Sequence, residues 1–315
     1  MNILLTGASG FLGEPLSECL DRDSRFVLTR AVRRKESLKN SRDVLIDGLH
    51  AGTDWATALN GQDVVVQAAA RVHIMKDEVS EPVAEYRKVN VDGTLNLARQ
   101  AVAAGVRRFV FISSIKVNGE DTPLNSPFTP GDKPAPEDAY GFSKMEAEQG
   151  LWDIARDTGM EVVIIRPPLV YGPGVKGNFA RMIKLVEKGL LLPLGAIHNK
   201  RSLVALDNLV DLIVSCIDHP AAANQIFLAG DGQDLSTTQL LRGIGKAMGK
   251  PARLIPVPAG MLMFGAALLG KKGVAQRVLG SLQVDISKAR NLLGWEPPIS
   301  VEEGLRRCFD SENTL

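Results

Sequence analysis

An apolar run followed at once by three evenly spaced glycines opens this chain. Residues 2–6 read Asn-Ile-Leu-Leu-Thr, which suits a buried parallel strand, and Gly7, Gly10 and Gly13 follow it. Gly7 permits a tight turn, Gly10 lets the backbone approach a pyrophosphate, and Gly13 lets the next helix pack closely on the sheet. The first N–H groups of that helix would face the phosphates. The sequence therefore predicts a dinucleotide-binding strand, turn and helix.

Apolar strand-like runs alternate with helical patterns through the first half of the chain. The runs are residues 2–6, 26–32, 43–46, 63–69, 108–113 and 161–165. Such alternation predicts an α/β fold with a doubly wound parallel Rossmann sheet covered by helices on both faces. After about residue 166 turn clusters interrupt the pattern, which indicates a smaller C-terminal α+β substrate-binding region. We expect residues 1–166, with returning segments near 203–229, to bind the dinucleotide, and residues 167–202 and 230–315 to bind the substrate.

The charge balance and the cysteines exclude several functions. The 315 residues contain 37 Lys and Arg against 36 Asp and Glu, so the net charge of +1 predicts no general attraction to nucleic acid or acidic membranes. Cys19, Cys216 and Cys308 form neither a metal-ligand spacing nor a disulfide framework. We therefore expect no metal site and a reducing compartment, with the cytoplasm as the default location.

One apolar stretch, residues 254–269, needs a structural explanation. It contains two prolines and is shorter than the ~20 residues that a membrane-spanning helix needs. We expect a packed helix or a lid and no integral membrane association, with contact at a membrane surface as the alternative.

Tyr140 and Lys144 form a candidate proton-transfer pair. Their spacing of four places a phenol and an ammonium on one face of a helix. An unperturbed phenol has a pKa of about 10, and a nearby cation favours the phenolate and lowers that pKa toward neutrality. Because Tyr and Lys also occur at this spacing on ordinary exposed helices, the pair is weak evidence by itself.

The end of the second strand bears on the choice of cofactor. Enzymes that select NAD place an acidic residue there to bind the ribose hydroxyls, whereas an arginine suits a 2′-phosphate. Arg33 and Arg34 stand at this point. The pattern favours NADP(H), with NAD(H) possible, and the alternative is a solvated basic turn. Asp47, near the end of the third strand, is a candidate contact to the adenine or an ordinary turn aspartate.

Six motifs, taken in order, resemble the extended short-chain dehydrogenase/reductase family and, within it, the nucleotide-sugar epimerases and reductases. They are Gly7-x-x-Gly10-x-x-Gly13, Gln67-Ala68-Ala69-Ala70, Asn90, Ser113-Ser114, Tyr140-x-x-x-Lys144 and Arg166-Pro-Pro-x-Val-Tyr-Gly-Pro-Gly. The resemblance covers nearly the whole chain, and six ordered motifs are far more specific than one.

This resemblance implies a role for each catalytic candidate. Ser114 would hydrogen-bond the substrate oxygen where negative charge develops, with Ser113 as its rival. Tyr140 would transfer the proton, and Lys144 would bind the nicotinamide ribose while the dinucleotide carries the redox step. The implied cofactor-binding residues are Gly7, Ser9, Gly10, Phe11, Leu12, Gly13, Arg33, Arg34, Asp47, Ala68, Ala69, Ala70, Asn90, Tyr140, Lys144 and Pro167.

The resemblance also implies a UDP-linked sugar as substrate. Asn178 and Arg201 match segments that hold the sugar nucleotide in the family, and Arg277 is a second arginine for the diphosphate. Ser114 and Lys116 would face the sugar, although an exposed loop lysine is the simpler interpretation of Lys116. His73 would line the cleft or serve a structural role.

Within the family the chain is most similar to bacterial reductases of surface-polysaccharide and O-antigen synthesis. The segments 53–55 and 67–75 carry this similarity, and Val117-Asn118-Gly119 departs from the Val-Tyr-Gly of many epimerases. We expect reduction of the C4 ketone of a UDP-linked 4-keto-6-deoxy-N-acetylhexosamine, yielding a product of the UDP-N-acetylquinovosamine or UDP-N-acetylfucosamine type. The alternative is a UDP-hexose 4-epimerase with retained NAD. Residues 83–104 and 140–156 resemble the family's dimer helices and predict a homodimer, or they face their own sheet.

Overall fold

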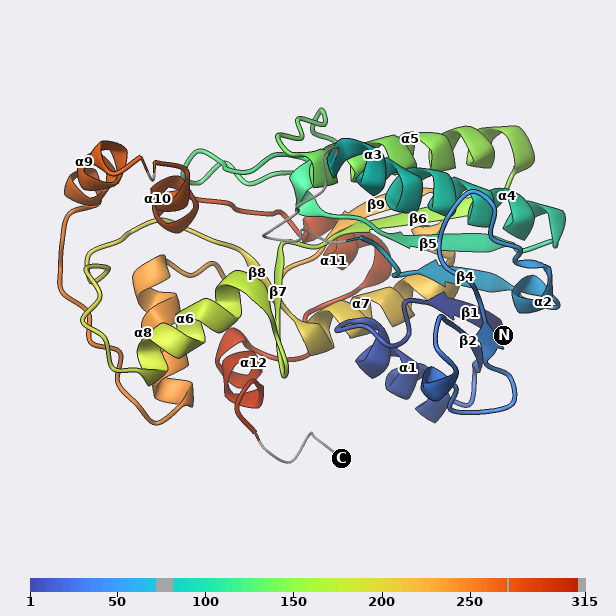
Figure 1. The fold of residues 1–315 in the computed structure, drawn as a ribbon, viewed down its shortest axis with the longest axis horizontal. Coiled ribbons are helices and arrows are strands. Elements are labelled where there is room, and N and C mark those ends of the chain that lie inside the picture. Colours follow the sequence, from blue (N-terminus) through green and yellow to red (C-terminus); the bar gives the residue numbers. More distant parts are fainter. Residues whose placement is uncertain (72–81, 271, 311–315) are drawn as a thin grey trace.

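A parallel sheet of seven strands forms the centre of the computed structural model, which describes residues 1–71, 82–270 and 272–310 (Figure 1). The strand order is β3-β2-β1-β4-β5-β6-β9, and every neighbouring pair is parallel. The strands are β1 (Asn2–Thr6), β2 (Val27–Val32), β3 (Val44–Leu45), β4 (Val64–Gln67), β5 (Arg108–Ile112), β6 (Glu161–Arg166) and β9 (Gln225–Leu228). The predicted doubly wound α/β fold is confirmed.

Helices cover both faces of this sheet because its strands are apolar on both sides. Along β1, Ile3 and Leu5 join one core while Leu4 joins the other, as the two-residue period of a strand requires. Figure 1 shows α1 and α7 below the sheet and α4 and α5 above it. The first face carries α1 (Gly13–Arg22), α7 (Leu206–Asp218) and α11 (Ser287–Leu293), and the second carries α2 (Ala56–Leu59), α4 (Thr94–Ala103) and α5 (Ala139–Thr158).

A second, smaller core lies in the C-terminal part of the chain. Its buried side chains include Tyr171, Phe179 and Leu240. The elements around it are β7 (Leu169–Tyr171), β8 (Leu203–Ala205), α6 (Gly177–Glu187), α8 (Thr237–Ala247) and α12 (Val301–Arg307). Strand β9 returns to the main sheet, whereas β8 pairs with β7 in a separate two-stranded sheet. The predicted domain limits remain a prediction.

Several further elements connect these layers. A π-helical stretch, η2 (Arg87–Gly93), links α3 (Pro82–Tyr86) to α4, and a short 3-10 turn, η3 (Ile115–Val117), follows β5. Other 3-10 turns are η1 (Lys35–Ser37) and η4 (Pro220–Ala222), and two further helices, α9 (Ala259–Leu268) and α10 (Lys272–Leu279), precede α11. Within the described ranges, no helix combines the length and apolarity needed to cross a bilayer.

Candidate active site

The glycine-rich turn between β1 and α1 has the shape of a phosphate cradle. Gly7 has a φ of +72°, and a Cβ there would lie 2.7 Å from the backbone nitrogen of Ala69. A Cβ on Gly13 would lie only 2.0 Å from the carbonyl oxygen of Gly7. Ser9 and Gly10 are exposed, and no side chain caps the N-terminus of α1. An anionic dinucleotide diphosphate therefore fits this turn, where Phe11 and Leu12 lead into the helix.

A buried polar network lies directly beneath this cradle. The Thr6 hydroxyl contacts the side-chain oxygen of Gln67, and the Gln67 amide donates to the Thr94 hydroxyl at 3.1 Å. The backbone N–H of Ala69 also donates to the Thr6 hydroxyl at 3.2 Å. These bonds fix the start of the Ala68–Ala70 segment, whose backbone packs directly against Gly7.

Helix α5 begins just before the candidate proton-transfer pair. Asp138 caps it by accepting a hydrogen bond from the backbone N–H of Gly141 at 2.7 Å. Tyr140 and Lys144 lie one turn apart on α5, and Lys144 Nζ lies 6.0 Å from the centroid of the Tyr140 ring. The Lys144 side chain is buried and donates to the carbonyl oxygen of Ile112 at 2.7 Å. The predicted shared helix face is present.

The protonation of this pair differs from what its spacing predicts. Burial lowers the pKa of Lys144 to about 7, although the carboxylate of Glu148 acts in the opposite direction. The pKa of Tyr140 is raised, first by burial, then by the carboxylate of Asp138, and last by the neighbouring phenol of Tyr86. The cation was expected to lower the phenol pKa. In the protein alone, burial weakens the positive charge of Lys144 and outweighs its effect.

The two candidate serines have different partners. Ser113 donates to the carboxylate of Glu148 at 2.5 Å in the interior. Ser114, at the edge of the buried region, accepts the backbone N–H of Lys116 at 3.3 Å as the cap of η3. Because that bond uses only a lone pair of Ser114, its hydroxyl hydrogen can still be donated to a substrate oxygen. The geometry favours Ser114 over Ser113.

A buried charge network supports this edge of the sheet, and sequence reasoning missed it. Arg166 pairs with Glu148 through Nη2 at 2.5 Å and Nε at 2.9 Å, and its Nη1 donates to the Asn118 side-chain oxygen at 2.9 Å. The Asn118 amide donates to the carbonyl oxygen of Thr129 at 3.1 Å. The four-residue spacing of Lys144 and Glu148 places both residues on one face of α5, but it does not point to Arg166 as the partner of Glu148.

Asn118 has a structural role in this network. The sequence motif Val117-Asn118-Gly119 departs from the Val-Tyr-Gly of many epimerases, yet Asn118 is buried and both ends of its amide are hydrogen-bonded within the protein. The departure from Val-Tyr-Gly consequently carries no weight in choosing a reductase over an epimerase.

Asn90 joins the chain after β4 to helix α5. Its side-chain oxygen accepts the backbone N–H of Arg71 at 2.8 Å, and its amide donates to the Arg71 carbonyl and the Ser143 hydroxyl, each at 3.0 Å. Nearby, the ring of Tyr86 meets that of Tyr140 edge to face, with centroids 6.0 Å apart. Asn90 thus holds the chain after β4 against helix α5. The predicted cleft residue His73 lies outside the described residues.

The residues proposed to select the cofactor are mostly exposed. Arg33 and Arg34 directly follow β2 and face solvent. Asp47 is also exposed and lies 3.1 Å from the imidazole of His50. Pro167 is buried, and its carbonyl oxygen accepts the backbone N–H of Ile115 at 3.0 Å, which ties β6 to the serine segment.

The proposed substrate residues occupy three separate places. Arg201 is largely buried, its pKa is lowered by that burial, and its guanidinium donates to the carbonyl oxygens of Arg277 and Gly280, each at 3.1 Å. The two arginines are therefore neighbours, with Arg277 exposed on α10. Asn178 is exposed in the first turn of α6. Lys116 is bound to Glu120 at 2.6 Å and Asp138 at 2.5 Å, which favours a structural role.

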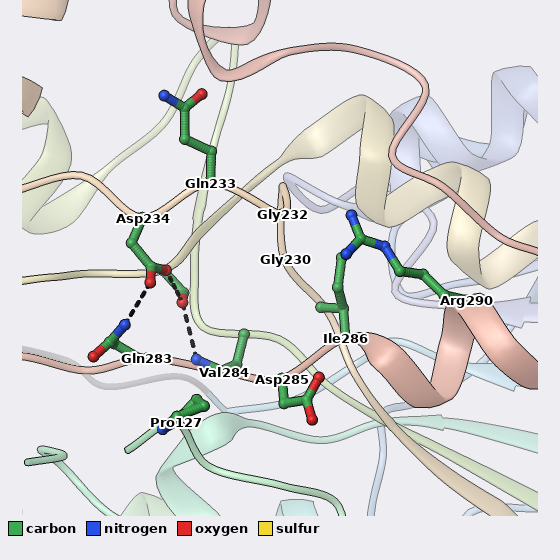
Figure 2. A pocket seen from close by; sticks show the side chains of 11 residues that line it. Pro127, Gly230, Gly232, Gln233, Asp234, Gln283, Val284, Asp285, Ile286 and Arg290 are labelled. Atoms are coloured by element: carbon green, nitrogen blue, oxygen red, sulfur yellow. Dashed lines mark hydrogen bonds between the residues drawn. The ribbon is translucent and has the colours of Figure 1, made fainter. Parts of the chain in front are cut away.

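A pocket lies where segment 283–286 crosses the chain that follows β9 (Figure 2). One of its two acidic side chains, Asp234, accepts hydrogen bonds from Gln283 at 2.6 Å and Ser202 at 2.5 Å. None of the predicted catalytic residues lines it. The bond from Gln283 holds segment 283–286 against the chain that follows β9.

Comparison with known proteins decides the family. The model of the NAD dependent epimerase/dehydratase family matches residues 3–230. The chain belongs to this family. Two sugar 4-epimerases are similar to this chain over nearly their whole length. A UDP-glucose 4-epimerase of Vibrio cholerae is 50% identical over 307 residues, which cover 97% of this chain and 94% of that protein.

Two further comparisons extend this result. The N-acetyl-alpha-D-glucosaminyl-diphospho-ditrans,octacis-undecaprenol 4-epimerase of Escherichia coli O157:H7 is 30% identical, over 99% of this chain and 95% of that protein. The crystal structure of a UDP-glucose 4-epimerase from Thermotoga maritima with UDP-glucose superposes with a TM-score of 0.76 at 25% identity, covering 98% of this chain and 97% of that one.

These relatives change the expected activity of this family member. They give no support to the predicted 4-ketoreductase and agree better with the alternative, a 4-epimerase. The family is described as NAD dependent, so the expected preference for NADP(H) finds no support in that description. A nucleotide-sugar enzyme of the extended short-chain dehydrogenase/reductase type is retained.

Proposed function

We propose that this protein is a UDP-hexose 4-epimerase that keeps its NAD bound. The single observation that carries the proposal is the 50% identity, over 97% of this chain, to the UDP-glucose 4-epimerase of V. cholerae. The arrangement of Ser114, Tyr140 and Lys144 at the carboxyl end of β5 supports it, because epimerisation needs a group that both removes and returns a proton. Such an activity would supply hexoses for surface-polysaccharide synthesis in the cytoplasm.

The proposed reaction leaves the number of protons and electrons unchanged. When bound, NAD would supply the hydride acceptor for the first half of the cycle and the hydride donor for the second. Tyr140 would take the proton of the C4 hydroxyl as C4 becomes a ketone. Once the sugar has turned its other face toward the cofactor, Tyr140 would return that proton to the C4 oxygen. Ser114 donates a hydrogen bond to the C4 oxygen throughout.

Lys144 would control the ionisation of the Tyr140 phenol. With a ribose hydroxyl as an additional hydrogen-bond partner, its ammonium would be stabilised and would favour the phenolate of Tyr140. On the substrate side, Arg201 and Arg277 would bind the diphosphate, and Asn178 on α6 would hold another part of the sugar nucleotide.

Turnover without added cofactor tests the proposal. We expect purified protein incubated with UDP-glucose alone to give a mixture of UDP-glucose and UDP-galactose, and denaturation of the protein to release NAD. If turnover instead required NADPH and consumed it in equal amount with a UDP-4-keto sugar, the 4-ketoreductase would be restored and the epimerase rejected.

A second candidate substrate is a hexosamine linked through diphosphate to a polyprenyl lipid. The 30% identical E. coli relative is named for such a substrate, and the exposed apolar helix α9 lies beside α10, which carries Arg277. Parallel assays with UDP-N-acetylglucosamine and the lipid-linked sugar distinguish the two candidates by their relative kcat/KM.

We also propose a homodimer through the outer sides of α4 and α5. Their inner sides, including Leu97 and Ala147, are already used by the protein's own core. Light scattering that gave the mass of one chain would reject this assembly.

A further inference from the structure

Helix α9 is apolar on every side, and yet none of its residues is buried. Its sequence is Ala-Gly-Met-Leu-Met-Phe-Gly-Ala-Ala-Leu, and Met261, Phe264 and Leu268 are 67%, 68% and 74% exposed. A helix that is apolar all round normally lies inside a protein or in contact with lipid. At ten residues and about 15 Å, α9 is too short to cross a bilayer.

The chain beside α9 extends the same apolar surface. Segment 190–196 runs along segment 254–258, where the backbone N–H of Ile255 donates to Leu192 at 2.8 Å. Leu191 and Ile255 on these segments are 66% and 44% exposed. We call this surface the apolar tip, formed by Leu190, Leu191, Ile255, Met261, Phe264, Leu268 and Leu269. In Figure 1, α9 lies at the far left, at the opposite end of the long axis from β2.

The sequence around the apolar tip is basic and contains no acid. Residues 235–284 hold seven Lys and Arg and no Asp or Glu, and residues 188–206 hold three more basic residues and again no acid. Arg253 and Lys272, which flank α9, are exposed. The segments that carry the apolar tip are therefore basic, although the net charge of the whole chain is near zero.

We propose that the apolar tip is a peripheral membrane-binding surface that docks on anionic phospholipid. A short apolar helix flanked by exposed basic residues matches a bilayer interface, in which apolar side chains reach the acyl chains and ammonium or guanidinium groups meet the phosphates. A second copy of this chain fits less well, because a symmetric contact would bring the same basic residues face to face. The surface is independent of the proton-transfer site.

Vesicle sedimentation of the full chain tests this inference. We expect the protein to pellet with vesicles of mixed phosphatidylglycerol and phosphatidylcholine, to pellet much less with phosphatidylcholine alone, and to be released by added salt. The double variant Met261→Glu with Phe264→Glu should weaken partitioning by at least about tenfold, since each carboxylate opposes insertion and anionic headgroups. Val27→Glu, an exposed apolar residue on β2, is the matched control and should bind as the wild type does.

Trp fluorescence and light scattering distinguish membrane docking from contact with a second copy of the chain. Trp introduced by Phe264→Trp should shift its emission to the blue with the anionic vesicles and not with phosphatidylcholine. If the wild type does not bind these vesicles, or if the double variant binds equally well, the inference is wrong. If instead the double variant halves the mass in light scattering while no form binds vesicles, a second copy covers the tip and membrane docking is rejected. Turnover of soluble UDP-sugar is expected to be equal in all forms, so it tests the proposed function separately.

Discussion

Lys144 Nζ lies 6.0 Å from the centroid of the Tyr140 ring. In the protein alone its hydrogen bond goes to the carbonyl oxygen of Ile112, and burial lowers the pKa of Lys144 to about 7 while raising that of Tyr140. The pair is therefore assembled in place, but the charges that favour proton removal depend on what binds beside them.

The buried ammonium makes the stability of the cofactor-free protein depend on pH. Between pH 7 and 9 the folded state holds fewer protons on Lys144 than the unfolded state, in which the pKa is 10.5, so the free energy of unfolding rises with pH. We expect urea titrations to show a gain of roughly 2 kcal/mol across this range in the wild type relative to Lys144→Met.

The exposed lysine Lys250 supplies the control for this comparison. Lys250→Met should keep the wild-type pH slope. An equal slope in Lys144→Met and the wild type would contradict the lowered pKa of Lys144.

Loss of the Tyr140 hydroxyl should abolish most turnover. We expect Tyr140→Phe to lower kcat about 10²–10⁴-fold with the fold intact, because the proton acceptor is removed while the ring remains. Tyr86→Phe makes the same chemical change on the ring that meets Tyr140, and its effect should be far smaller. The measurement is UDP-glucose turnover with circular dichroism as the folding control, and similar rates in both variants would refute the role of Tyr140.

The two adjacent serines should separate catalysis from stability. Ser114→Ala should lower kcat about 10²-fold with little change in unfolding free energy, since its hydroxyl would act on the developing oxyanion. Ser113→Ala removes a buried hydrogen bond to the Glu148 carboxylate, and we expect it to cost about 1–3 kcal/mol in urea unfolding. Its kcat should stay within a few-fold of the wild type. The reverse pattern would assign the substrate contact to Ser113.

Local sequence rules predicted the parts of this protein that local spacing determines. The glycine turn, the strand of residues 2–6 and the shared face of Tyr140 and Lys144 follow from periods of two, three and four residues. The Ser113–Glu148–Arg166 network could not be predicted in this way, because it joins β5, α5 and β6 through tertiary packing. We expected a packed helix or a lid at residues 254–269, whereas no residue of α9 is buried. The sequence could not show this exposure, because an apolar run has the same pattern whether other parts of the protein cover it or not.

Substitution of Gly13 should remove the bound dinucleotide. A Cβ at this position would lie 2.0 Å from the carbonyl oxygen of Gly7, so Gly13→Ala forces α1 away from the turn that would hold the diphosphate. We expect the NAD content of the purified variant to fall at least about tenfold, with activity falling in parallel. Gly131→Ala is the matched control because an added Cβ there meets no atom within 4 Å. Full NAD content in Gly13→Ala, measured by chromatography of the nucleotide released on denaturation, would show that the dinucleotide binds elsewhere.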